Sequence, residues 1–341
     1  MILGGRKSLT LLNCSSHTRR CVKRILFRLL TVPCLLVGSN NKNKETSMKL
    51  LILGSNGQVG HCLVDHAERK SLDFYATNSS QLDITDNSKV EEVFRQVNPS
   101  LVINATAYTN VEKAEDEPEK ALDVNSKSVG NLANLCSQKN IPLIHISTDY
   151  VFDGTKDGYY QETDPVNPIN SYGRSKLAGE KAIIDNIDKY IIIRTSWVFG
   201  RHGKNFVKTM LNLFRSRDEL TVVSDQIGGP TFAGDIATAI LKISEVLENS
   251  PVFSDWGIFN FSGKEDVNWF EFAKIIYEAS RRKQLITRDV SIKPIPTSMF
   301  KTKAVRPQNS KLDLSKIKNV FDISASDWRS EIDNYIEHYL Q

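Results

Sequence analysis

The chain has 341 residues, of which 40% are hydrophobic and 25% charged, an ordinary composition for a globular protein with a sizeable core. Its net charge of +4 is unevenly distributed: residues 1–47 hold nine basic side chains and one acid, so they carry +8 and the remainder carries −4. A mildly acidic body lacks the basic surface that nucleic-acid binding requires, so we expect no nucleic-acid partner.

Cysteine usage separates the same two parts of the chain. Cys14, Cys21 and Cys34 lie before residue 47, and only Cys62 and Cys136 follow. Two cysteines in so long a body form no disulfide framework, and no metal-ligand spacing is present. We therefore predict a cytoplasmic protein without a bound metal.

Residues 1–47 are basic, dotted with Ser and Thr, and nearly free of acids. An apolar stretch at 25–37 contains Arg28 and is too short to span a bilayer. The segment is compatible with a transit peptide or with a signal peptide or anchor. The third alternative, a protein that really starts at Met48, is favoured because a strand pattern begins directly after that residue. We expect little packed structure before Met48 and no membrane partner for the body.

A glycine-rich turn follows the first predicted strand, residues 49–53. The turn reads Gly54-Ser55-Asn56-Gly57-Gln58-Val59-Gly60, and a helical pattern runs from it through His66. Strand, glycine turn and helix together place a pyrophosphate on a helix N-terminus, although any tight turn of this kind can carry glycines. The predicted cofactor contacts are Gly54, Asn56, Gly57, Gln58 and Val59.

Strands and helices then alternate along the chain. The predicted strands are residues 73–77, 101–107, 143–148 and 190–196, and the predicted helical regions are 87–96, 118–139 and 177–185. Such alternation indicates an α/β fold, a Rossmann-type doubly wound parallel sheet with helices on both faces. Ligands of such folds bind beyond the carboxyl ends of the strands.

Small or polar residues follow two of these strands. Ala105, Thr106 and Ala107 would let a cofactor pass close to the backbone. Asp83 and Ile84, after the second strand, are expected to meet an adenine edge. The alternative for Asp83, a helix N-cap, is equally compatible with the sequence.

The strongest chemical pattern is the Tyr-x-x-x-Lys formed by Tyr172 and Lys176. On a helix, this spacing puts phenol and ammonium on one face, and the ammonium favours the phenolate and lowers its pKa. Upstream, Thr148 ends a predicted buried strand, where its hydroxyl could orient a carbonyl group. Taken alone, the Tyr-x-x-x-Lys pattern is compatible with an ordinary helix surface, and Thr148 with a strand-end cap. Their order after the glycine turn indicates a nicotinamide-dependent reductase.

Longer strings carry a closer resemblance. Residues 147–152 (STDYVF), 194–199 (RTSWVF), 225–231 (DQIGGPT) and 306–310 (RPQNS) resemble the dTDP-4-dehydrorhamnose reductase family of extended short-chain dehydrogenases/reductases, from about residue 48 to the C-terminus. The resemblance implies hydride delivery from NAD(P)H to C4 of a 4-keto-6-deoxy sugar nucleotide. It also implies that Tyr172 donates the proton, that Lys176 tunes Tyr172 and holds the nicotinamide ribose, and that Thr148 orients the carbonyl.

The segment after the second strand bears on cofactor choice. Residues 77–80 read Thr-Asn-Ser-Ser, with no acid to repel a 2′-phosphate and no arginine to bind one. We therefore expect NADPH as the cofactor, with NADH tolerated.

Helical patterns at 205–215, 233–247 and 269–280 and a short strand at 258–261 fill the rest of the chain. By resemblance, residues 48–200 are the NAD(P)-binding domain, and 201–341 are mainly a smaller α/β substrate-binding lobe partly interleaved with it. Homodimer formation is also expected.

Substrate contacts are expected from three side chains and one loop. Tyr150 and Trp197 would lie near the reacting sugar, and Arg306 and the loop 294–297 would lie near the diphosphate or base. Trp197 is also compatible with a core position and Arg306 with a surface ion pair. The carboxylates Glu162, Asp164 and Glu180 are expected to be caps or a solvated face.

Two other functions remain compatible with these residues. The beta subunit of methionine adenosyltransferase resembles the same family and binds NADP as a regulatory protein. A protein relieved of catalysis can lose Thr148, Tyr172 or Lys176, whereas this chain keeps all three. A sugar-nucleotide epimerase or dehydratase is the second alternative; a dehydratase needs an acid–base pair where this chain has Asp149-Tyr150, which favours simple reduction.

Overall fold

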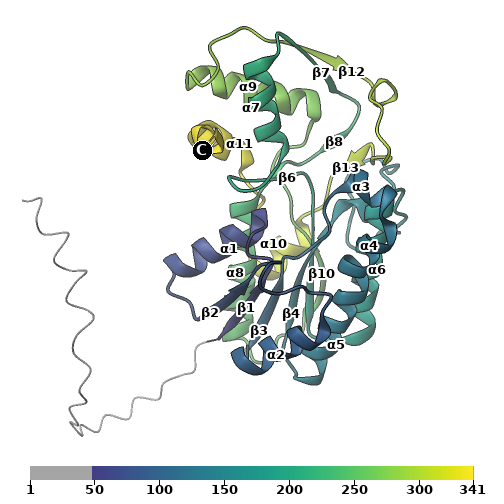
Figure 1. Cartoon of the computed structure of the whole chain (residues 1–341), viewed down its shortest axis with the longest axis vertical. Helices are drawn as coiled ribbons and strands as arrows, with labels where there is room; N and C mark the ends of the chain where they lie inside the picture. Colours follow the sequence, from purple (N-terminus) through teal and green to yellow (C-terminus); the bar gives the residue numbers. More distant parts are fainter. Residues whose placement is uncertain (1–47, 341) are drawn as a thin grey trace, which may run out of the picture. The chain divides into compact units, whose positions relative to one another are not determined.

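A six-stranded parallel sheet lies at the centre of residues 48–340, the part of the chain that the computed structural model describes. Its strand order is β10-β5-β4-β3-β1-β2 (Figure 1). The strands are β1 Leu50–Leu53, β2 Phe74–Thr77, β3 Leu101–Asn104, β4 Leu143–Thr148, β5 Tyr190–Thr195 and β10 Gly257–Asn260. The order reverses beside β1, which is where ligands bind in open parallel sheets. The expectation for residues 1–47 lies outside the described residues.

Helices cover both faces of this sheet, as the predicted doubly wound fold requires (Figure 1). Apolar residues on both faces of the strands make this necessary: β1 and β3 are buried along their whole length. The helices on one face are α1 Gln58–Arg69, α8 Ala233–Asn249 and α10 Ser315–Phe321. Those on the other are α2 Asn87–Val97, α5 Ser128–Gln138 and α6 Ser171–Asn186.

Two predicted elements differ from the structure. The strand predicted over 101–107 ends at Asn104, because Oδ1 of Asn104 accepts hydrogen bonds from the backbone N–H and hydroxyl of Thr106 and turns the chain into a loop. The long helix predicted over 118–139 is three segments: α4 Pro118–Leu122, a π-helical turn Asp123–Lys127, and α5.

A second hydrophobic core lies beyond the carboxyl ends of the strands (Figure 1). It is built by α7 Phe206–Ser216, α9 Trp269–Arg282 and α11 Trp328–Tyr335, beside the parallel pair β7 Glu219–Val223 and β12 Ser291–Ile295. Short strands connect the two cores: β6 Val198–Phe199, β8 Ile227–Gly228, β9 Thr231–Phe232, β11 Val267–Asn268 and β13 Asn309–Ser310.

Sequence patterns missed several of these elements, namely α3 Val111–Asp116, β7, β12, α10 and α11. The loop predicted at 294–297 is wrong for its first half, since Pro294 and Ile295 lie in β12. Proline is tolerated there because β12 pairs with one neighbour only. Because α8, β10 and α10 join the sheet layer although they follow residue 200, the chain is interleaved. The exact division at residue 200 stays a prediction.

Candidate active site

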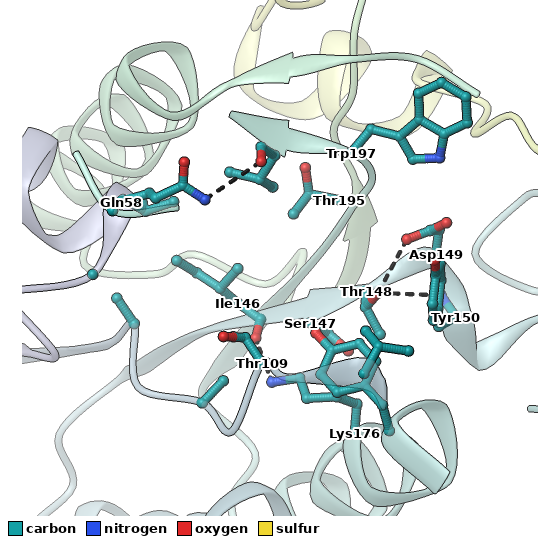
Figure 2. Close-up of a pocket in the computed structure, with 18 of the residues that line it drawn as sticks. Gln58, Thr109, Ile146, Ser147, Thr148, Asp149, Tyr150, Lys176, Thr195 and Trp197 are labelled. Atoms are coloured by element: carbon teal, nitrogen blue, oxygen red, sulfur yellow. Dashed lines mark hydrogen bonds between the residues drawn. The ribbon is translucent and has the colours of Figure 1, made fainter. Parts of the chain in front are cut away.

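A cavity of about 540 Å³ opens at the carboxyl ends of β1, β3, β4 and β5. It gathers most of the predicted site residues: Asn56, Gly57, Gln58, Val59, Ala105, Thr106, Ala107, Thr148, Tyr150, Tyr172, Lys176 and Trp197. Figure 2 shows Gln58, Trp197 and Lys176 on three different sides of it. Four predicted residues do not line it: Gly54, Asp83, Ile84 and Arg306.

The glycine turn between β1 and α1 supplies one wall of the cavity. Gly54 has φ +87°, and a Cβ there would lie 2.8 Å from the carbonyl carbon and oxygen of Ala105. A Cβ on Gly60 would lie 2.0 Å from the carbonyl oxygen of Gly54, so this turn closes only with glycine. Helix α1 begins at Gln58 behind Gly57, with no side-chain cap on its first N–H groups. These free donors, open to the cavity, fit the pyrophosphate of a dinucleotide cofactor.

Asp83 and Ile84 are held in a turn before α2. The exposed Asp83 accepts hydrogen bonds from the backbone N–H and hydroxyl of Thr85, at 2.9 and 2.7 Å. Asp86 is the N-cap of α2, so the N-cap alternative for Asp83 is wrong. Ile84 is buried. Contact of these two residues with an adenine stays a prediction.

Tyr172 and Lys176 lie on one face of α6, whose first turn is capped by Asn170. Lys176 is 1% exposed, and its Nζ donates to the carbonyl oxygen of Ile146 at 2.7 Å (Figure 2). Burial lowers the pKa of Lys176 to about 8, against the attraction of Glu180.

The pKa of Tyr172 is raised, not lowered as the Tyr-x-x-x-Lys pattern predicted. Burial is the main cause and the nearby Asp149 adds to it, while a hydrogen bond with Thr148 acts in the opposite direction. The prediction fails because the amine of Lys176 is directed at β4 rather than at the phenol. A raised pKa keeps Tyr172 protonated at neutral pH, as a proton donor requires.

Thr148 ends β4 and begins a 3-10 turn. Its Oγ1 accepts a hydrogen bond from the N–H of Tyr150 at 3.2 Å and donates to Oδ1 of Asp149 at 3.0 Å (Figure 2). Burial raises the pKa of Asp149 to about 6, opposed by hydrogen bonds from Ser310 and Thr148. The single proton of Thr148 is thus directed at Asp149 when that side chain is ionised. Asp149 lines the cavity and was not predicted as a site residue.

Trp197 is partly buried: it packs against the second hydrophobic core and also lines the cavity. It adopts φ +48°, which is unusual for a bulky residue, and its ring stacks on Trp269 with centroids 3.5 Å apart and planes 8° apart. Trp269 also lines the cavity, and its Nε1 donates to Gln226 at 3.1 Å. Sequence reasoning missed Trp269, because its contact with Trp197 arises only from tertiary packing.

Arg306 and Glu180 are both engaged in ion pairs. Arg306 pairs with Glu112 of α3 at 2.6 Å, as its surface-pair alternative predicted, so a role in diphosphate binding stays a prediction. Glu180 was expected on a solvated face, which is wrong: it is 1% exposed and pairs with the buried Arg194 of β5 at 2.7 Å.

Comparison with known proteins adds to this geometry. Residues 48–341 match the RmlD substrate binding domain family. The dTDP-4-dehydrorhamnose reductase of Aggregatibacter actinomycetemcomitans is 42% identical over 84% of this chain and 97% of its own length. That of Escherichia coli K12 is 36% identical over 83% and 95%. The chain belongs to the dTDP-4-dehydrorhamnose reductase family.

A solved structure of this family supports the same assignment. The dTDP-4-dehydrorhamnose reductase of Bacillus anthracis, crystallised in complex with NADP, superposes with a TM-score of 0.78 at 34% identity, covering 85% of this chain and 99% of that one. Epimerase structures at 20% identity or below, such as UDP-glucose 4-epimerase of Thermus thermophilus with a TM-score of 0.69, share the fold alone.

No group of three or more His, Cys, Asp or Glu side chains within residues 48–340 is arranged to hold a metal ion. No helix in this part of the chain is both long and apolar enough to cross a membrane.

Proposed function

We propose that this protein reduces the C4 keto group of dTDP-4-dehydro-L-rhamnose to give dTDP-L-rhamnose, with NADPH as the cofactor. The observation that carries the proposal is one cavity that is lined by the glycine turn together with Thr148, Tyr172 and Lys176. The family and the NADP complex of its Bacillus anthracis relative support the substrate and the cofactor.

Each of these residues has a separate role in the proposed reaction. NADPH, when bound, supplies the hydride that C4 receives. Tyr172 donates its phenolic proton to the carbonyl oxygen, which completes the alcohol. Thr148 donates a hydrogen bond to the same oxygen once its proton turns away from Asp149. Lys176, on the same helix face as Tyr172, would hold the ribose hydroxyls.

The remaining predicted residues bind the two ligands. The turn from Gly54 to Val59 and the loop Ala105–Ala107 hold the cofactor. The stacked Trp197–Trp269 pair and Tyr150 provide flat surfaces beside the sugar. Arg306 would bind the diphosphate: one nitrogen of its guanidinium pairs with Glu112, and the group also hydrogen-bonds the phenol of Tyr150, which lines the cavity.

The regulatory alternative is not favoured. A binding protein that resembles the beta subunit of methionine adenosyltransferase has no need of a proton donor and a carbonyl-orienting hydroxyl in the same cavity. In this chain both are present and adjacent, joined by the hydrogen bond between Thr148 and Tyr172.

The direct test follows NADPH absorbance with dTDP-4-dehydro-L-rhamnose, using residues 48–341 and the Tyr172→Phe variant. We expect oxidation by the first protein and a loss of kcat of about 10²- to 10⁴-fold in the variant, with NADPH binding retained. Binding without oxidation in both proteins would reject the reductase and revive the regulatory alternative.

Homodimer formation and a cytoplasmic location are part of the same proposal. Cys62 and Cys136 are both free and buried, which fits a reducing compartment. Light scattering of the purified protein tests the dimer, and fractionation of cells that express the full chain tests the location.

A further inference from the structure

His145 lies behind Lys176, completely buried in β4. Its ring bridges two side chains: Nδ1 is 3.1 Å from Nδ2 of Asn104, and Nε2 is 3.0 Å from Nζ of Lys176. None of these three side chains is more than 1% exposed. Water therefore does not compete for their hydrogen bonds. In each of the two contacts, one nitrogen must donate a proton and the other must accept it.

The partners of Asn104 determine where the proton of His145 lies. The backbone N–H and the hydroxyl of Thr106 both donate to Oδ1 of Asn104, at 3.0 and 2.6 Å. A backbone N–H only donates, so Oδ1 must face Thr106 and Nδ2 must face His145. Because Nδ2 also only donates, Nδ1 of His145 accepts, and a neutral ring carries its proton on Nε2. Burial and the nearby Lys176 hold the pKa of His145 well below its usual value, which keeps the ring neutral.

This arrangement affects the charge of Lys176. The Nε2–H of His145 points at Nζ, where an uncharged amine can accept the hydrogen bond and an ammonium cannot. Donation to the carbonyl oxygen of Ile146 is open to both forms. We propose that His145, held by Asn104 with its proton on Nε2, is a positioning residue that favours the uncharged form of Lys176. The lysine then changes charge near neutral pH instead of remaining an ammonium throughout.

The charged groups around Lys176 do not favour its uncharged form. On its own helix, Tyr172 is neutral at these pH values, and Glu180 raises the pKa of Lys176. The carboxylate of Glu180 is already bonded by Arg194 of β5, at 2.7 and 3.0 Å, and by the hydroxyl of Ser147. Asp149 lines the same cavity, but its interaction partners are Thr148 and Ser310. The hydrogen bond from His145 therefore acts in the same direction as burial, which lowers this pKa to about 8.

Any effect of the Lys176 charge on catalysis rests on the proposed function, whereas the positions of the protons on His145 and Lys176 do not. They are measured by NMR on the full chain, with ¹⁵N-labelled histidine and ¹³Cε-labelled lysine. The His145→Gln and Lys176→Arg variants assign the two signals. In the wild type we expect the Nε2–H tautomer for His145, and a Lys176 signal that titrates near pH 8 while ordinary lysines titrate near pH ~10.4.

The Asn104→Asp variant reverses the direction of the hydrogen bond between residue 104 and Nδ1 of His145. A carboxylate accepts from Nδ1–H, so the proton should leave Nε2, which then accepts from an ammonium. We expect the tautomer to change and the pKa of Lys176 to rise by about one unit or more. The Asn104→Leu variant removes the amide without adding charge, and should raise the pKa of Lys176 by a smaller amount.

Two results would overturn the proposal: an Nδ1–H tautomer in the wild type, or a Lys176 pKa that neither variant changes. A purely structural role for Asn104 and His145 would lower the melting temperature of the variants and leave both NMR readouts as in the wild type. If Asn104→Asp does not fold, the wild-type tautomer and Asn104→Leu still decide. None of these readouts needs turnover, so a failed reductase assay leaves them valid.

Discussion

Burial sets the acid–base behaviour of individual residues in this site. Tyr172, Lys176 and Asp149 all have shifted pKa values, and in each case the loss of solvent is the largest cause. Burial opposes the charged form, so the two acids move up and the base moves down. The result is a phenol that stays protonated and a lysine and a carboxyl group that change charge nearer to neutrality than free side chains do.

Asp149→Asn should make stability less dependent on pH. The pKa of Asp149 is raised to about 6 from 3.8, so the folded protein loses stability through this group as the pH rises through 6. The difference is on the order of 3 kcal/mol when fully developed. In urea unfolding at a series of pH values, the variant should gain stability relative to wild type between about pH 4 and 7 and show a constant gain above. A gain independent of pH would contradict the assigned shift.

Gly60→Ala should weaken cofactor binding by displacing the glycine turn between β1 and α1. The new Cβ would lie 2.0 Å from the carbonyl oxygen of Gly54, so the turn must move. We expect a loss of about 1–3 kcal/mol in stability and about tenfold or more in NADPH affinity, measured by unfolding and fluorescence titration. Gly130→Ala in α5 is the control, because its Cβ meets only the side chain of Ala182, at 3.2 Å. Equal losses in both variants would show that the turn has no special role.

At the scale of elements, α6 carries the predicted catalytic pair, Tyr172 and Lys176, and is fixed against the sheet. Glu180 on α6 and Arg194 on β5 form a buried ion pair, and the hydroxyl of Ser147 on β4 bonds the same carboxylate. Arg194 also stacks over the ring of Phe152, 5.1 Å from its centroid. These contacts tie one helix to two strands, one helical turn away from Lys176.

Arg194→Met should be more harmful than the double variant Arg194→Met/Glu180→Gln. The single change leaves the carboxylate of Glu180 buried without its cation, which costs about 3–5 kcal/mol, whereas the double change removes the charge as well. Denaturant unfolding of both variants and of Glu180→Gln measures the coupling between the two residues. Additive effects would show that the pair does not act as a unit.

At the scale of the whole molecule, the cavity is assembled from two hydrophobic cores. Ala105 follows β3 and Thr148 ends β4, while Lys204 and Trp269 come from segments that belong to or border the second core. A ligand that fills the cavity therefore holds both together, and its binding energy adds to the stability of the fold.

NADPH should accordingly raise the melting temperature of residues 48–341 and of the full chain by the same amount. At about 100 times its Kd, the cofactor contributes about 2.7 kcal/mol. NADH should raise it less, because the segment after β2 was predicted to accept the 2′-phosphate. Differential scanning fluorimetry compares the two cofactors, with Gly60→Ala as the control. A larger shift with NADH would reverse the predicted preference.

Local patterns in the sequence were sufficient for the fold class, and they picked out residues that the structure brings together, although the cofactor and catalytic roles of these residues stay predictions. Alternating apolar strands and helices, the glycine turn and the Tyr-x-x-x-Lys spacing each depend on residues close together in the chain, and the structure places them in one cavity. The same reasoning gave no notice of α3, β7, β12, α10 and α11, which are short and are stabilised by packing rather than by their own periodicity.

Only the tertiary structure decided the interactions between residues distant in sequence. The stacking of Trp269 on Trp197, the burial of Glu180 and the pairing of Arg306 with Glu112 each join residues from separate elements. The direction of the Tyr172 pKa shift also depends on the tertiary structure. The spacing places Lys176 on the same helix face as Tyr172, but it does not predict that the amine points at His145 and Ile146. A side chain's charge depends on its solvent exposure and on its partners, and both are set by the packed fold.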